Sequence, residues 1–136
     1  TWVAVNVLGP DRAQEARVGE SLAAVAEPGD TLVVFGGRAD VQLLSGMASP
    51  YAHLWSLPMR TLDPEYAELR DVLEGPDAPT WIVEAAWFGS WENPWAPALW
   101  ETVSARYTEV RDVCGDGPRI WLLDGVDRPA PEVPCR

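Results

Sequence analysis

The chain has 136 residues, of which 47% are hydrophobic and 23% charged, and its formal net charge is −11 at pH 7. These values are typical of one globular domain with a substantial core, and they argue against a disordered chain. The negative charge disfavours binding to nucleic acid or to an anionic lipid surface, and no apolar run approaches the roughly 20 residues that a membrane-spanning helix needs.

The first third of the chain is predicted to contain two helices around one strand. Residues 2–8 are expected to form an edge strand or the tail of a preceding helix, and Gly9 then starts a helix that ends at residues 28–30. Residues 31–35 form a short continuous apolar run, which is typical of a strand covered on both faces. A short helix is expected from about Asp40 to Leu44.

The middle of the chain is predicted to hold an extended stretch, a helix and a strand. The extended stretch is centred on residues 54–57 and closed by Pro58. Asp63 is a strong candidate for a helix N-cap, and Gly75 ends that helix. The apolar segment 81–83 is the next predicted strand.

The last part of the chain is predicted to form a helix, a strand and a tail. The helix is expected from about Pro97 to Val113, the strand over residues 120–123, and an extended tail over 126–136. Because strands alternate with helices, we predict an α/β fold for residues 1–136 as a single domain. The expected architecture has three layers, with a mainly parallel sheet of about four to five strands and helices on both faces.

The most informative segment is a tryptophan-rich stretch. Four of the eight tryptophans fall within fourteen residues, and glycine and proline in the same stretch argue against a helix over most of it. We predict a loop at the end of a sheet on which flat indole rings bind sugar faces, flanked by acids that accept hydrogen bonds from hydroxyls. Packing of these side chains over the sheet edge is the alternative. The ligand-binding candidates in this stretch are Trp87, Trp91, Trp95, Glu84 and Glu92.

Further candidates lie before this loop. Trp55 and Arg60 are additional ligand-binding candidates, and nearby His53 is either a general base or a structural hydrogen-bonding residue. The glycine turn at residues 36–40 is either a phosphate-binding turn or a plain tight turn, and it lacks the Lys of a phosphate-binding loop. No complete catalytic constellation, no metal site and no cofactor motif is predicted.

The two cysteines, Cys114 and Cys135, are too few to hold a metal without other ligands. We favour one disulfide, which would indicate an oxidising compartment outside the cytoplasm. Two buried free thiols are the alternative.

An ordered set of short phrases carries a resemblance to a known family. The phrases are residues 28–34, 45–46, 49–51, 54–58, 63–64, 79–83, 107, 113–115, 124–126, 128–129 and 135. In this order they resemble the C-terminal extracytoplasmic domain of actinobacterial polytopic membrane proteins. Those proteins are similar to the lipid-phosphate-sugar-dependent glycosyltransferases of the C superfamily, which includes the protein mannosyltransferases.

This resemblance implies an α/β domain at the extracytoplasmic face of the cell membrane, attached to a membrane-embedded part of the same protein. The chain begins with Thr1 and is therefore expected to be a fragment. In the family the catalytic acids lie in the membrane part, so no catalytic residue carries over to this chain. The family's spacing also supports pairing of Cys114 with Cys135.

Three functions remain as hypotheses. The first is a non-catalytic accessory domain of a cell-envelope glycosyltransferase that binds a glycan or a polyprenyl-phosphate sugar. The second is a structural or protein-interaction module of a membrane protein, because exposed tryptophans also mark interfaces. The third is an independent hydrolase that uses His53 and a nearby acid.

Overall fold

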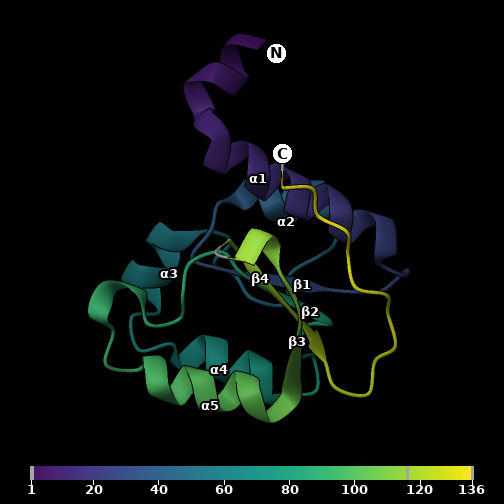
Figure 1. Cartoon of the computed structure of the whole chain (residues 1–136). Coiled ribbons are helices and arrows are strands. Elements are labelled where there is room, and N and C mark those ends of the chain that lie inside the picture. The colour runs from purple at the N-terminus through teal and green to yellow at the C-terminus, as the bar shows by residue number, and fades with distance from the viewer. Residues whose placement is uncertain (1, 116, 136) are drawn as a thin grey trace.

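The computed structural model describes residues 2–115 and 117–135, with side chains described from residue 14 onward (Figure 1). Its centre is a four-stranded sheet in the order β1-β2-β4-β3. The strands are β1 (Leu32–Phe35), β2 (Trp81–Glu84), β3 (Tyr107–Asp112) and β4 (Arg119–Leu123).

Helices cover both faces of this sheet. In Figure 1, α1 (Trp2–Val25) and α2 (Ala39–Ser45) lie above it, and α4 (Ala67–Glu74) and α5 (Ala96–Arg106) lie below it. A short helix, α3 (Ser56–Leu62), and the 3-10 turns η1 (Ser90–Glu92) and η2 (Val113–Gly115) lie in the connections. Among the described residues, no helix combines the length and apolar character that crossing a membrane requires.

The sheet is mixed, and the prediction of a mainly parallel sheet is wrong. Only β1 and β2 pair in parallel; β4 runs antiparallel to both β2 and β3. The reason is local: α5 ends at Arg106, and residues 107–112, predicted as helix, form β3 instead. Tyr107, Thr108 and Val110 favour extended backbone, and only a short connection links β3 to its antiparallel partner. As a result β1, β2 and β3 share one direction, and their carboxyl ends meet at one edge.

Alternate residues of each strand enter two separate cores. Phe35, Ile82 and Trp121 face α4 and α5, whereas Leu32, Trp81 and Val83 face α1 and α2. All six are at most 5% exposed, and β1 and β2 are buried throughout, whereas β3, at an edge of the sheet, has exposed residues. Trp81 and Trp121 are therefore core residues, one in each core.

The other element predictions have mixed outcomes. The strands predicted at 31–35, 81–83 and 120–123 and the helix predicted at 40–44 are confirmed, as is the end of α4 at Gly75. Residues 2–25 form one helix, so an edge strand at 2–8 and a helix start at Gly9 are both wrong. Residues 56–62 are helical, so the extended stretch at 54–57 is wrong too. Pro58 is tolerated there because the first helical turn has no acceptor for its missing N–H.

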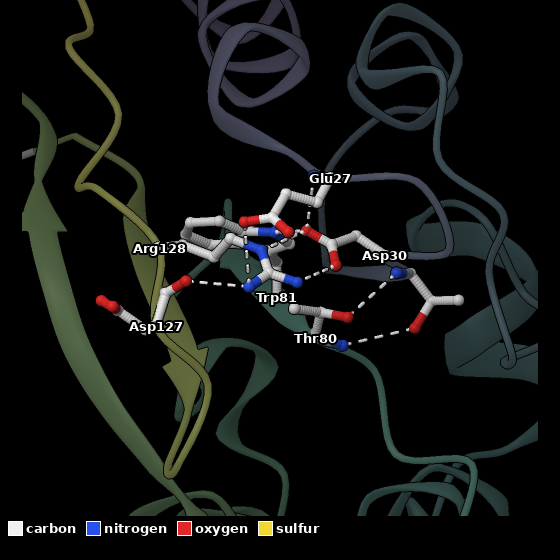
Figure 2. Close-up of polar contacts among 7 residues, drawn as sticks. Glu27, Asp30, Thr80, Trp81, Asp127 and Arg128 are labelled. Atoms are coloured by element: carbon white, nitrogen blue, oxygen red, sulfur yellow. Dashed lines mark hydrogen bonds and ion pairs between the residues drawn. The ribbon is translucent and has the colours of Figure 1, made fainter.

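A buried carboxylate joins the end of the chain to the start of the sheet (Figure 2). Asp30 accepts hydrogen bonds from the backbone of Glu27 at 3.0 Å and from Trp81 Nε1 at 3.2 Å. Arg128 adds two more, from Nε at 3.0 Å and from Nη2 at 2.7 Å. The Arg128 guanidinium holds the pKa of Asp30 below its usual value, although burial opposes this. The tail is therefore fixed against the amino end of β2.

The tail is fixed a second time at its far end. Cys114 and Cys135 form a disulfide, as predicted. Between the two attachments, Arg111 Nε donates to the carbonyl of Pro131 at 3.0 Å, and Arg17 Nε donates to that of Pro134 at 3.3 Å. The tail thus closes over the α1 side of the sheet without regular secondary structure of its own.

Replacing Asp30 by Ala is expected to lower the free energy of unfolding by about 3 kcal/mol, because buried donors lose their acceptor. Urea unfolding measures this loss. Glu132→Gln is the control, because the Glu132 side chain is 92% exposed and its contact with Arg111 is a surface ion pair. Equal, small losses in both variants would contradict a central role for Asp30.

The stability difference between wild type and Asp30→Ala is expected to depend on pH in one direction. Because folding lowers the pKa of Asp30, its contribution is present above the unfolded pKa of about 3.9 and is lost as the pH falls through the folded pKa. The stability difference between wild type and Asp30→Ala should therefore shrink in acid. A difference that grows there would show the opposite linkage.

Removing the disulfide with Cys114→Ser and Cys135→Ser is expected to cost roughly 3 kcal/mol on the chain-entropy account, since the bridge spans a sequence separation of 21. Urea unfolding of the double variant measures the cost. Wild type treated with a reductant should behave like the variant. An unchanged midpoint in both would mean that the tail is held without the bridge.

Candidate ligand-binding site

The carboxyl ends of β2 and β3 border a cavity of about 470 Å³. Its wall includes Gln14 and Glu15 of α1, Glu84 at the end of β2, Asp112 at the end of β3 and Arg119 at the start of β4. The sheet register explains this gathering, because Arg119 is paired both with Glu84 and with Asp112. Trp87, from the tryptophan-rich loop after β2, completes the wall.

Glu84 is the most constrained of the cavity's acids. It is only 3% exposed, and its two carboxylate oxygens hold two different parts of the molecule. Trp121 Nε1 donates to Oε1 at 3.1 Å, and the backbone N–H of Phe88 donates to Oε2 at 3.0 Å. Burial raises the pKa of Glu84, and these two hydrogen bonds oppose the rise. Glu84 therefore fixes the start of the tryptophan-rich loop to β4.

Asp112 supplies an unused acceptor. Its Oδ1 atom is out of contact with solvent and has no hydrogen-bond partner among the described residues. A buried acceptor left unpaired costs about 1–3 kcal/mol, so such an atom calls for a donor from a ligand or a water molecule. Among the side chains that the structure describes, Arg119 is the one guanidinium in this wall, and it also lies 3.6 Å from Glu109. The cavity as a whole is rich in acceptors.

The Trp87 side chain packs on one side against the backbone of Gly89, and most of its surface is exposed. Trp87 is 66% exposed, the largest exposed fraction among the tryptophans from residue 14 onward. A Cβ atom added to Gly89 would lie 2.7–2.9 Å from three atoms of the Trp87 ring. The indole therefore rests on Gly89, where only glycine leaves room for it. The result is a flat apolar surface beside a cavity lined by acids.

The predicted ligand-binding residues do not form one site. Glu84 and Trp87 line the cavity, but Trp91, Trp95, Glu92, Trp55 and Arg60 do not. Trp91 is half-buried against Phe35 at a ring distance of 5.9 Å, so the packing alternative applies to it. Trp95 and Trp55 are 39% and 45% exposed, and Glu92 is exposed with left-handed backbone at φ 52°.

His53 and the glycine turn also lie apart from the cavity. His53 Nε2 is 3.1 Å from Glu68 Oε2, and its ring packs edge-on against Tyr51 at 5.0 Å. These contacts give His53 a structural role. Gly36 has φ +73°, and the carbonyl of Gly37 accepts a hydrogen bond from Ser56, so this segment is a tight turn before α2. Within the described residues, no group of three potential metal ligands is close enough to hold an ion.

Sequence reasoning missed Gln14, Glu15, Asp112 and Arg119. The first two lie on the helix that was expected to cover the sheet, where acids are usually solvated. Asp112 was assigned to the end of a helix, and only the hairpin between β3 and β4 brings it to the cavity. A period-two pattern over residues 107–111 was the available signal for that strand.

Comparison of the chain with known protein families, curated proteins and solved structures found no significant match. The membrane-protein resemblance therefore stays a prediction.

A carbon-13 NMR titration should give the Glu84 carboxyl a pKa above its ordinary value of about 4.3, because burial disfavours the charged form. A raised folded pKa means that the carboxyl contributes most below the unfolded pKa and less as the pH rises through the folded one. Glu84→Gln should thus gain stability relative to wild type between about pH 4 and pH 7. A Glu84 pKa at or below the ordinary value would contradict the desolvation argument.

Proposed function

We propose that this domain is a non-catalytic accessory module that binds an uncharged saccharide in the cavity at the carboxyl ends of the strands. Its context would be a cell-envelope glycosyltransferase, with this domain at the extracytoplasmic face and attached to a membrane-embedded part. The observation that carries the binding proposal is the placement of Trp87. Its ring rests on Gly89 at the edge of a cavity whose wall supplies carboxylates.

The two kinds of group suit the two surfaces of a sugar. An indole offers a large, rigid apolar face at little entropic cost, and this face fits the C–H side of a pyranose or furanose ring. The carboxylates accept hydrogen bonds from hydroxyl groups, and charge-assisted hydrogen bonds are stronger than neutral ones. Asp112 Oδ1 is the clearest acceptor for such a hydroxyl, because it lacks a protein donor. A site of this size and composition fits one or two sugar units.

Charge argues against a phosphate group in the same cavity. Glu15, Glu84 and Asp112 face a single guanidinium there, that of Arg119, so a phosphate would meet an excess of negative charge. Of the two ligands predicted from sequence, the geometry thus favours a glycan over the phosphate of a polyprenyl-phosphate sugar. A neutral glycan would be the acceptor that the membrane part modifies.

The cellular context rests on other observations. The disulfide between Cys114 and Cys135 suits an oxidising compartment. Attachment to a membrane-embedded region follows from the family resemblance alone.

A protein-interaction module is the second candidate, and one surface favours it. Leu54, Trp55 and Leu57, at the start of α3, are 37%, 45% and 54% exposed. Adjacent exposed apolar side chains of this size are typical of interfaces. Light scattering of the purified domain, with Trp55→Ala as the variant, separates this function from saccharide binding. A dimer that dissociates in the variant would favour the interaction module.

Trp87→Ala is expected to weaken binding of neutral arabinan or mannan fragments at least about tenfold, which corresponds to about 1.4 kcal/mol. Calorimetry is the suitable measurement, because the substitution removes a fluorescent reporter. Gly89→Ala should also weaken binding, because its Cβ displaces the ring. Trp55→Ala is the matched control, since Trp55 is also exposed but lies outside the cavity.

Two results would count against saccharide binding. One is the absence of any heat change with wild type at about 10 mM ligand, a concentration at which even weak sugar binding is detectable. The other is equal affinity of wild type and Trp87→Ala. Equal losses in Trp87→Ala and Trp55→Ala would indicate a contact that is not specific to the cavity.

A further inference from the structure

Two arginines lack the partners that every other arginine with a described side chain has. Of the ten arginines, eight have side chains that the structure describes, and six of these make hydrogen bonds or ion pairs. The six are Arg17, Arg38, Arg106, Arg111, Arg119 and Arg128. Arg60 and Arg70 make neither within the described part of the chain, although the protein has 21 acids to pair with them.

Both of these arginines instead stack on the tryptophan-rich loop. The guanidinium carbon of Arg60, in α3, lies 4.7 Å from the centroid of the Trp91 ring. That of Arg70, in α4, lies 5.5 Å from the centroid of the Trp95 ring. Cation–π contacts of this kind hold a guanidinium by its face and leave its N–H groups pointing outward from the edge.

A hydrogen bond fixes the loop that carries both tryptophans to the connection between α3 and α4, the helices that carry the two arginines. Asn93 Nδ2 donates to the carbonyl of Pro64 at 2.9 Å, and Asn93 Oδ1 accepts from the backbone of Trp95 at 2.8 Å. Asn93 lies between Trp91 and Trp95 in the sequence, and its side chain is hydrogen-bonded to the segment that connects α3 and α4. The backbone N–H of Arg70 donates to the carbonyl of Tyr66. Burial raises the pKa of the Tyr66 hydroxyl, and the charge of nearby Arg60 partly opposes this rise.

One donor of these guanidinium groups is buried without a partner, whereas Arg60 is exposed to solvent. Arg70 Nε is out of contact with solvent and has no acceptor among the described residues. A guanidinium carries five N–H donors and no acceptor, and a buried donor without a partner is costly. Such an atom is explained by a ligand oxygen at the stack's edge.

We propose that Arg60 and Arg70 form a binding site for an oxyanion, either a phosphate ester or a carboxylate. The planar guanidinium matches both groups with paired hydrogen bonds, and Trp91 and Trp95 hold the two planes ready for them. This site is separate from the acid-lined cavity and does not depend on what the cavity binds. The cavity wall carries carboxylates, whereas this site is built on two guanidinium groups, which attract anions.

A purely structural role for the stacks makes a different prediction. If Arg60 and Arg70 only fix the loop by stacking, anions do not perturb their N–H groups at all. If they bind an oxyanion, the binding is salt-dependent, because the net charge of −11 opposes anions and only the local guanidinium groups attract them.

The test is a titration of the whole chain with inorganic phosphate, glucose 6-phosphate, glucuronate and, as the neutral control, glucose, at constant ionic strength. The Nε–H signals of Arg60 and Arg70 in nitrogen-15 NMR report directly on the site and require no variant. We expect both to shift with one or more of the anions and not with glucose. Comparing the shifts caused by inorganic phosphate and glucose 6-phosphate with those caused by glucuronate distinguishes phosphate binding from carboxylate binding.

The variants give the second readout. The double variant R60Q and R70Q should lose at least about tenfold in affinity for the bound anion, and R38Q should stay within about twofold of wild type. Arg38 suits as the control because it is also half-exposed but already paired with Asp40 at 3.3 Å. W87A should bind the anion as wild type does, which separates this site from the cavity.

Two outcomes would overturn the proposal. One is the absence of any shift of the two Nε–H signals with all three anions at up to about 20 mM, since weaker binding carries no function. The other is undiminished affinity in the double variant. If the double variant fails to fold, the single variants and the wild-type NMR titration decide.

Discussion

The carboxylate of Glu84 is the constraint on which the arrangement of this molecule's candidate sites depends. It is buried at the end of β2, the strand between β1 and β4, and it accepts hydrogen bonds from Trp121 in β4 and from Phe88 in the loop. A single side chain thus fixes the tryptophan-rich loop to the sheet. Burying a carboxylate beside other acids is unfavourable, and burial raises the pKa of Glu84. The residue therefore lowers the folding stability while it fixes the geometry of the loop.

At the other end of β2, a buried carboxylate again accepts a hydrogen bond from an indole N–H, but its pKa is lowered rather than raised. Trp81 donates its indole N–H to Asp30, as Trp121 does to Glu84, but Asp30 also faces the guanidinium of Arg128. The charged partner lowers the pKa of Asp30, whereas Glu84 lacks a comparable partner. The amino edge of the sheet is therefore closed by an ion pair and by the tail. The cavity lies at the carboxyl edge, where β2 and β3 end and where the disulfide between Cys114 and Cys135 holds the far end of the tail.

The tryptophan-rich loop divides between two surfaces because its residues leave the sheet in different directions. Trp87 stays beside the cavity and rests on Gly89, whereas Trp91 and Trp95 lie against α3 and α4 and support arginines. Left-handed backbone at Trp91 and Glu92 marks the point where the chain changes course. The even spacing of Trp87, Trp91 and Trp95 in the sequence gives no sign of this division.

Sequence alone determined the elements whose signals are local and strong. The apolar runs at 31–35, 81–83 and 120–123, the short helix before Ser45, the buried Trp81 and Trp121, and the pairing of Cys114 with Cys135 all follow from composition, spacing or motif. Tertiary structure decided the direction of β4, the formation of a strand by residues 107–112, and the contacts that each tryptophan side chain makes. Strand direction and side-chain contacts depend on register between segments far apart in the chain. Local propensity cannot encode that register, because only the packed sheet sets which residues stand opposite one another.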